Sequence, residues 1–228
     1  MTPYYDHAGV TIYHADNREV IPAISGITGV LTDPPYGLKA ARKGAFGYGV
    51  KHHMTGFRAG SSKAVPKRDY GHSNWDDEPA PQEIIDSLIA LAPRVVIWGG
   101  NYFQVPPAKG WLVWDKMRGE TDFADCELAW SNLNCAVRRF RYRWNGFLQE
   151  RGHYDVRYHP TQKPLSLMLW CLKLMGDQAQ TIFDPYAGSG TTLVAAKQTG
   201  RRAIGCETEE RYCEIIARRC DQEVLELV

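Results

Sequence analysis

Short apolar runs along the chain are separated by longer stretches in which apolar residues recur every three or four positions. A run of about four to eight β-branched and aromatic residues that ends at turn-forming residues is typical of a buried strand. Runs with this character predict strands at Val10–His14, Ile27–Thr32, Arg94–Trp98, Trp111–Trp114, Thr181–Phe183 and Arg202–Cys206. Two longer runs, at 123–131 and 135–142, predict a further pair of strands.

The stretches between these runs carry helix start and stop signals. Pro81 and Pro164 each suit a first helical position, and Gly176 suits the position after a helix end. Thr208 is a candidate N-cap for the last helix. The predicted helices cover about 18–24, 81–92, 164–175, 191–198 and 208–220. Strands that alternate with helices predict an α/β fold with a largely parallel sheet.

Length and composition fit one domain that spans residues 1–228. The chain is 44% hydrophobic, which supports a sizeable core. It has no apolar run of eighteen residues, and its N-terminus lacks the basic start and apolar segment of a secretory signal, so we expect no membrane partner. Its six cysteines form no C-x-x-C pair and no zinc spacing, which predicts reduced thiols, a cytoplasmic protein and no metal site.

The net charge of +1 conceals an uneven distribution of charge. Residues 38–75 form an insertion, and eight basic residues follow one another between Lys39 and Arg68 without an acidic residue. Such a segment is either a solvated insertion or a mobile basic loop that meets phosphates. A second basic pattern alternates along 138–143, as on one face of a strand or on an exposed edge strand. The candidate DNA contacts are Lys39, Arg42, Lys43, Arg139, Arg141 and Arg143.

A carboxylate follows the predicted strand 27–32 directly. Asp33 comes before Pro34 and Pro35, which stiffen the backbone, and the aromatic ring of Tyr36 comes next. Open α/β sheets place their chemistry at the carboxyl ends of strands. A carboxylate, the carbonyls of a stiff turn and a flat ring can together hold a planar amino group, although a Pro-Pro turn with a solvated acid has the same sequence.

A strand, a Gly-rich loop and a helix follow one another at 183–192. The glycines allow a ligand to approach the backbone, and Glu207 at the next strand end is placed to accept from ribose hydroxyls. The loop lacks the lysine of a P-loop, and Leu193 stands where a dinucleotide fold has a third glycine. S-adenosylmethionine fits better, since it combines a ribose, an adenine and a zwitterionic methionine end.

Three motifs together resemble the beta-class S-adenosylmethionine-dependent DNA amino-methyltransferases. They are Asp-Pro-Pro-Tyr at 33–36, His-Pro-Thr-Gln-Lys-Pro at 159–164 and Phe-Asp-Pro-Tyr-Ala-Gly-Ser-Gly-Thr-Thr at 183–192. The resemblance covers nearly the whole chain. It implies a Rossmann-like class I methyltransferase fold with a seven-stranded, mostly parallel sheet, helices on both faces and a circularly permuted strand order. It also implies a short target-recognition region at about 135–158.

The resemblance also implies roles for individual residues. The target amino group would donate to Asp33 and to the Pro34 carbonyl, beside Pro35, and the flipped base would stack on Tyr36. The cofactor would contact residues from four segments: Asp16, Thr161, Lys163, Asp184, Ala187, Gly188, Ser189, Gly190, Thr191 and Glu207.

Two acceptors on an exocyclic amino group would localise its lone pair, which otherwise delocalises into the ring and makes the nitrogen a poor nucleophile. The base has to leave the duplex to reach such a pocket. The resemblance favours adenine N6 in double-stranded DNA, because Asp at the first motif position is commoner in the adenine enzymes of the family. Cytosine N4 and a catalytically silent binding module on the same fold are the alternatives. A homodimer, the recognition sequence and a restriction–modification context stay open.

Overall fold

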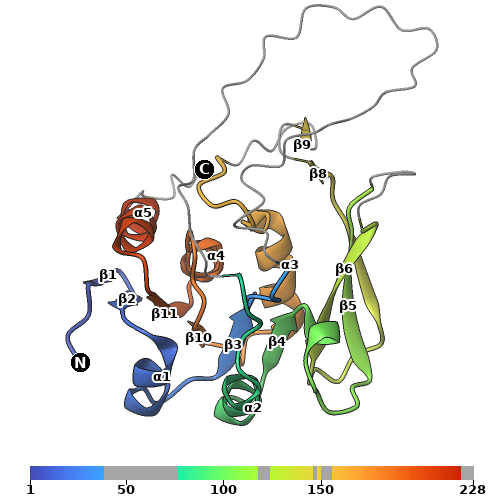
Figure 1. Cartoon of the computed structure of the whole chain (residues 1–228), viewed down its shortest axis with the longest axis horizontal. Coiled ribbons are helices and arrows are strands. Elements are labelled where there is room, and N and C mark those ends of the chain that lie inside the picture. The colour runs from blue at the N-terminus through green and yellow to red at the C-terminus, as the bar shows by residue number, and fades with distance from the viewer. Residues whose placement is uncertain (39–75, 118–123, 146–147, 150–155, 222–228) are drawn as a thin grey trace, which may run out of the picture.

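The computed structural model describes residues 1–38, 76–117, 124–145, 148–149 and 156–221. Within them a nine-stranded sheet has the order β1-β2-β11-β10-β3-β4-β6-β5-β7 (Figure 1). Its strands are β1 (Tyr5–His7), β2 (Val10–His14), β11 (Arg202–Glu207), β10 (Thr181–Asp184), β3 (Gly29–Thr32), β4 (Val95–Trp98), β6 (Cys126–Ser131), β5 (Gly110–Asp115) and β7 (Arg138–Arg141). A separate two-stranded sheet pairs β8 (Trp144–Asn145) with β9 (Leu148–Gln149).

The centre of the sheet is parallel. Strands β2, β11, β10, β3 and β4 all run in the same direction, whereas β6 runs antiparallel to both of its neighbours. Strands β2 and β3 come from the first part of the chain. They flank β11 and β10, which come from its last part. The α/β class and the mostly parallel sheet are confirmed, while the circular permutation stays a prediction.

The predicted count of seven strands is wrong for this sheet, because one more strand is added at each edge. Strand β1 forms a hairpin with β2 through a turn in which Ala8 and Gly9 have positive φ angles of 50° and 80°. Its sequence, Tyr-Asp-His, lacks the apolar pattern by which a strand is recognised. Strand β7 was expected in the run 135–142 but is shorter, and it pairs in parallel with β5.

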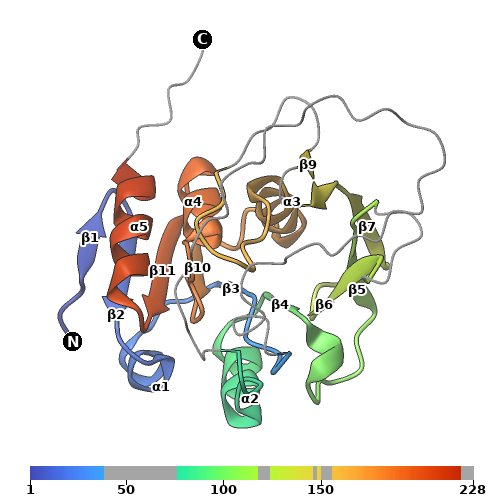
Figure 2. The ribbon, with the colours of Figure 1, turned by 45° about the horizontal axis from the view of Figure 1, so that its top comes forward.

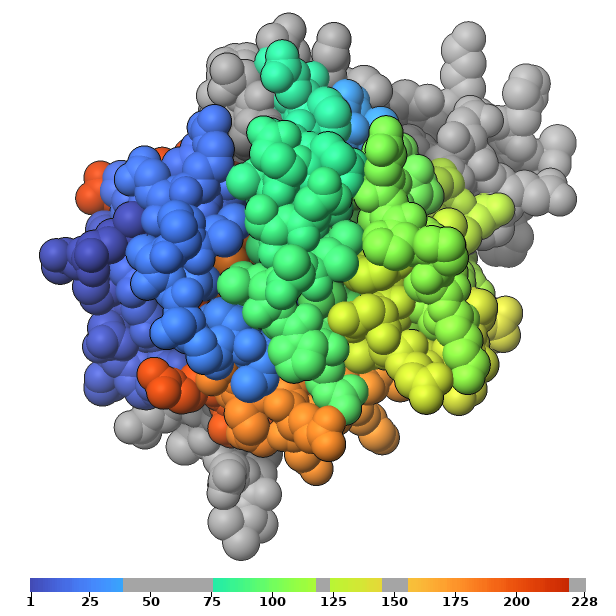
Figure 3. All heavy atoms as spheres, turned by 90° about the horizontal axis from the view of Figure 1, so that it is seen from below, coloured from blue at the N-terminus to red at the C-terminus, as the bar shows by residue number. Residues whose placement is uncertain are grey.

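Helices cover both faces of the sheet, as predicted (Figures 1 and 2). One face carries α1 (Asn17–Val20) and α2 (Gln82–Leu91), which lie side by side over it in Figure 3. The other carries α3 (Leu165–Met175), α4 (Thr191–Gln198) and α5 (Glu210–Asp221). Along β3 and β4 successive residues enter opposite cores: Val30 and Val95 pack with α2, whereas Leu31 and Val96 pack with α3. Burial on both faces explains why these strands are largely apolar.

Helix boundaries differ slightly from those expected. The predicted helix at 18–24 is split into α1 and the 3-10 turn η1 (Ile21–Ala23), because Pro22 has no backbone N–H to continue the α-helix. Helix α5 begins at Glu210, and the Glu209 carbonyl accepts its first hydrogen bonds. The N-cap is therefore Glu209 rather than the predicted Thr208. In the described ranges no helix has the length and apolarity needed to cross a membrane.

Candidate active site

The carboxyl ends of the central parallel strands open into one cavity of about 460 Å³. That volume lies within the range of small-molecule pockets. Its wall contains Asp33 from the end of β3 and the loop that follows β10, so the two motifs that lie far apart in the sequence meet there. The predicted site residues that line it are Asp16, Asp33, Pro35, Thr161, Lys163, Asp184, Ala187, Gly188, Ser189, Thr191 and Glu207. Pro34, Tyr36 and Gly190 are not among its described lining residues.

The loop after β10 is held by hydrogen bonds at both ends. Asp184 accepts from the Thr32 hydroxyl at 2.7 Å and from the Tyr186 backbone N–H at 3.1 Å. Gly188 has a φ of 53° and donates its backbone N–H to Glu207 at 2.9 Å. A residue with a side chain adopts this left-handed conformation only at a cost. The loop is therefore pinned to two carboxylates that themselves face the cavity.

Asp184 is buried and Glu207 is half-buried, and loss of hydration raises the pKa of both carboxyl groups. The pKa of Asp184 rises to about 6, and that of Glu207 rises to about 7, because burial outweighs the hydrogen bonds that each accepts. Two acids that are costly to ionise without a partner favour a ligand that brings hydrogen-bond donors or positive charge.

The segment before α3 closes one side of the cavity. The Gln162 side chain accepts from the Ser189 hydroxyl at 2.9 Å, and its backbone carbonyl accepts from the Trp144 indole N–H at 3.1 Å. The His159 ring accepts from the Thr161 backbone N–H at 3.3 Å. Burial, followed by the nearby cations, lowers the pKa of His159 to about 3, so its ring is neutral. Thr161 and Lys163 are thus presented to the cavity by a turn that the Gly-rich loop braces.

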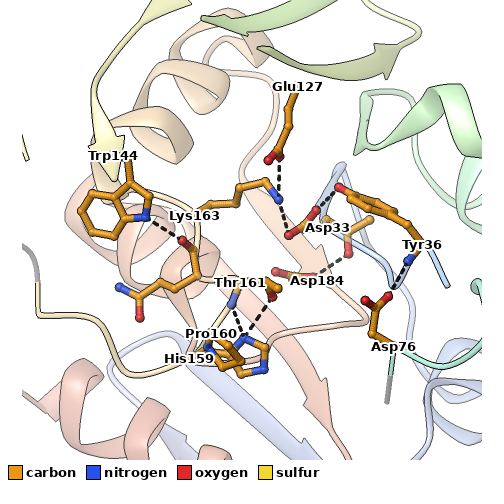
Figure 4. A network of polar contacts seen from close by, with 12 residues as sticks. Asp33, Tyr36, Asp76, Glu127, Trp144, His159, Pro160, Thr161, Lys163 and Asp184 are labelled. Carbon is orange, nitrogen blue, oxygen red and sulfur yellow. Dashed lines mark hydrogen bonds and ion pairs between the residues drawn. The ribbon is translucent and has the colours of Figure 1, made fainter. Parts of the chain in front are cut away.

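Asp33 lies between two partners in a short polar network (Figure 4). Its Oδ1 accepts from the Tyr36 hydroxyl, and its Oδ2 lies 2.5 Å from Lys163 Nζ. Burial raises the pKa of Asp33, and the Lys163 cation opposes that shift. Asp76 holds the turn that follows by accepting from the Tyr36 and Gly37 backbone N–H groups at 3.1 and 3.0 Å.

The two proline carbonyls of the turn differ in whether they already accept a hydrogen bond. The Pro35 carbonyl accepts from the Ala80 backbone N–H at 2.9 Å. The Pro34 carbonyl receives no hydrogen bond from the part of the chain that the structure describes. It therefore keeps an acceptor available beside Asp33, as the prediction for the target amino group requires.

The Tyr36 ring already has an aromatic neighbour. Tyr102, in the 3-10 turn η2 (Gly100–Tyr102), stacks on it with ring centroids 4.8 Å apart and an angle of 18° between planes. Gly99 packs so closely that an added Cβ would lie 2.0 Å from the Tyr36 ring. A base that stacks on the face now covered by Tyr102 would displace that side chain, which is 48% exposed.

Comparison with known proteins identifies the family. Residues 97–218, more than half of the chain, match the model of the N6/N4 DNA methylase family. The chain belongs to this DNA methylase family. The Type II methyltransferase M2.LlaDCHI of Lactococcus lactis subsp. cremoris is 24% identical over 96% of this chain and 92% of its own. M2.DpnII of Streptococcus pneumoniae is 39% identical over 35% of this chain and 30% of its own.

Solved structures share the fold of the methylase. M1.HpyAVI in complex with SAM aligns with a TM-score of 0.54 at 20% identity, over 93% of this chain and 100% of its own. The cytosine-N4-specific PvuII DNA methyltransferase aligns with a TM-score of 0.55 at 13% identity, over 98% of this chain and 90% of its own. The predicted family and fold class are confirmed, and the family assignment bears out the predicted cofactor class.

The predicted DNA contacts of the methylase fall in two regions. Lys39, Arg42 and Lys43 lie outside the described residues, as does most of the basic insertion. Arg139, Arg141 and Arg143 are exposed at alternate positions of the β7 segment, while the aromatic residues between them turn inward. Arg141 and Arg139 approach Asp115 at 3.2 and 4.0 Å. The arginines form one basic face, but their contact with DNA stays a prediction, as does a target-recognition region at 135–158.

Two further charged residues of the methylase lie near the site and were not predicted from the sequence. Glu127 in β6 and Lys116 after β5 are paired with each other, and Lys163 Nζ lies 3.1 Å from Glu127. The sequence does contain a signal, since Glu127 is an acid inside a predicted strand, where an unpaired charge is costly. Lys163, predicted to border the cofactor, in fact also reaches Asp33.

Proposed function

We propose that this methylase transfers a methyl group from S-adenosylmethionine to the N6 amino group of adenine in double-stranded DNA, with the base flipped out of the helix. The observation that carries the proposal is the shared cavity, whose wall holds both Asp33 and the Gly188 loop. A donor and an acceptor of a methyl group need to meet at one place, and positioning of this kind lowers a barrier by up to about 7–11 kcal/mol.

The residues around the cavity fit this cofactor. Asp184 is a buried acceptor and Glu207 a half-buried one, and the cofactor offers an ammonium group and ribose hydroxyls as donors. Asp16, at the N-cap of α1, supplies a third carboxylate on the side where the resemblance puts the adenine amino group. When bound, S-adenosylmethionine supplies an electrophilic methyl group on a sulfonium centre. Thr161 and the backbone of 187–191 would hold its methionine end.

On the base side, Asp33 and the Pro34 carbonyl would accept the two hydrogens of the amino group. This arrangement localises the nitrogen lone pair and needs no base strong enough to deprotonate a neutral amine. The nitrogen would become positive as it takes the methyl group, and it would then lose one proton to Asp33 and from there to water. Tyr36 would stack on the flipped base after Tyr102 moves aside, at a stacking free energy of roughly 1–3 kcal/mol.

Nucleoside analysis tests the proposal directly. DNA incubated with the protein and S-adenosylmethionine is digested to nucleosides and separated by mass spectrometry. We expect N6-methyladenine. Recovery of N4-methylcytosine would assign the same machinery to the other amino group of the family, and recovery of neither would refute methylation of DNA amino groups. The Type II methyltransferases among the relatives support a restriction–modification role. A homodimer stays a prediction.

Cofactor affinity should rise with pH. Asp184 and Glu207 have raised pKa values of about 6 and about 7, so both are largely neutral at pH 5 and ionised at pH 8. Because an ionised carboxylate is the stronger acceptor, binding favours the charged forms and releases protons. We expect affinity to increase roughly tenfold or more between pH 5.5 and 8. Calorimetry in buffers of different ionisation enthalpy measures both the cofactor affinity and the number of protons released on binding. Affinity that does not vary with pH would contradict this role, and Glu207→Gln should flatten the upper part of the profile.

The basic face of β7 should contribute to DNA binding. Replacing Arg141 and Arg143 by glutamate is expected to weaken binding and to lower the salt slope of log K by roughly one for each phosphate that is no longer neutralised. Arg138→Glu, compared with Arg141→Glu alone, is the matched control, because each reverses one charge on the same strand at positions of opposite alternation. Fluorescence anisotropy across a salt series measures the slope. Equal slopes for wild type and the double variant would exclude this surface.

A further inference from the structure

Lys163 bridges two carboxylates at the edge of the cavity (Figure 4). Its Nζ lies 2.5 Å from Asp33 Oδ2 and 3.1 Å from Glu127 Oε2. Lys163 is only 7% exposed, so its charge has to be matched by protein groups rather than by water. The three residues come from the segment before α3, the end of β3 and strand β6, and only the folded chain brings them together.

Glu127 has a second partner across the sheet. Lys116, 8% exposed, forms an ion pair with it where β5 runs antiparallel to β6. Asp33, Lys163, Glu127 and Lys116 thus form a chain of two acids and two bases. Burial alone would raise the pKa of Glu127, but Lys163 and Lys116 outweigh it and lower that pKa to about 2, so Glu127 stays ionised.

This network bears directly on the proposed role of Asp33. Each oxygen of Asp33 already accepts one hydrogen bond, one from the Tyr36 hydroxyl and the other from Lys163, so a further donor has to use a remaining lone pair or replace one of these two. A target amino group that approaches Oδ2 from the cavity, which Lys163 also lines, takes the place of the Lys163 ammonium. A buried ammonium left without a partner would be strongly unfavourable. Glu127 removes this penalty, because it lies within reach of the same nitrogen.

We propose that Lys163 and Glu127 are positioning residues for Asp33: Lys163 orients the Asp33 carboxylate before the base arrives, and Glu127 retains Lys163 when the target amino group replaces it. This inference rests on the proposed function, since it assigns the amino group to Asp33. It also explains why a second acid stands in a strand beside the site. As the reacting nitrogen becomes positive, Glu127 neutralises the nearby Lys163 and leaves the charge of Asp33 to the amine.

Lys163 and Glu127 shift the pKa of Asp33 in opposite directions. The charged and titratable groups around Asp33 are Lys163, Glu127, Tyr36 and Asp184, and Lys116 and His159 lie one contact further out. Loss of the Lys163 cation raises the pKa of Asp33, because an attractive charge is gone. Loss of the Glu127 charge lowers the pKa of Asp33, because a repulsive charge is gone and Lys163 then pairs with Asp33 alone.

The test measures single-turnover methyl transfer against pH for wild type, Lys163→Met and Glu127→Gln, with tritiated S-adenosylmethionine and DNA that wild type methylates. In the profile of rate against pH, we expect Glu127→Gln to lower the plateau rate about 10- to 100-fold. We also expect it to move the acid limb, where the rate falls as the pH falls, to lower pH. Lys163→Met is expected to move that limb to higher pH. Cofactor affinity of Glu127→Gln should stay within about threefold of wild type. Glu127→Asp keeps the charge and should keep the wild-type limb, and Glu83→Gln on the exposed face of α2 is the matched control.

Limbs that do not move, or that move in the same direction in both variants, would overturn the inference. A general loss of packing lowers the plateaus but leaves the limbs in place. A carboxyl ¹³C NMR titration of Asp33, assigned by its disappearance in Asp33→Asn, reads the same two pKa changes without turnover. If wild type transfers no methyl group, the proposed function fails, while this titration still decides whether Lys163 and Glu127 control Asp33.

Discussion

Asp33→Ala is expected to lower methyl transfer by roughly 10²–10⁴-fold, the range typical of a group that acts on the reacting proton or lone pair. Alanine removes the acceptor from the amino group and leaves Lys163 with Glu127 as its described ion-pair partner. Cofactor binding should stay within a few-fold of wild type, because Asp184 and Glu207 stand on other strands. Single-turnover transfer and calorimetric titration with S-adenosylmethionine separate the two effects.

Asp177→Ala is the control for this substitution. Asp177 is a fully exposed acid whose only described ion pair, with Arg201, is 3.9 Å long, so its removal should leave the rate unchanged. Wild-type turnover by Asp33→Ala would remove the acid from the mechanism. An equal loss of turnover and of cofactor affinity would assign Asp33 to cofactor binding instead.

Gly190→Ala is expected to cost roughly 2–5 kcal/mol of the free energy of unfolding and to abolish cofactor binding. Gly190 has a φ of 79°, where a side chain costs about 1–2 kcal/mol, and an added Cβ would lie 2.7 Å from Ile216 in α5. Overpacking of this kind adds about 1–3 kcal/mol. Relief of the clash would push the loop of 187–190 away from α5 and into the cavity that we propose for the cofactor.

Gly200→Ala separates the two causes. Gly200 has a similar φ of 69°, but nothing lies within 4 Å of an added Cβ. It should therefore lose only the backbone contribution, about 1–2 kcal/mol, and keep cofactor affinity. Denaturant unfolding and calorimetry measure both variants. If the two variants lost the same stability, the contact between Gly190 and Ile216 would have no energetic role.

Local patterns predicted most of the elements. Strands β2, β3, β4, β5, β10 and β11 and helices α2 to α5 appear where apolar runs and helix end signals predict them, because these signals act within a few residues. Strand β1 was missed because its residues are polar and it is held by pairing with β2 rather than by burial.

Local sequence alone places the acids that follow or end the strands: Asp33 after β3, Asp184 at the end of β10 and Glu207 at the end of β11. Parallel strands bring their carboxyl ends to one edge, so a strand-by-strand reading already predicts a common site. Which charges meet at that site depends on the three-dimensional fold. Lys163 and Asp33 are 130 positions apart, and Glu127 enters from the antiparallel part of the sheet. Ion pairs depend on distance in space, and no local sequence pattern shows that side chains from three separate elements will meet.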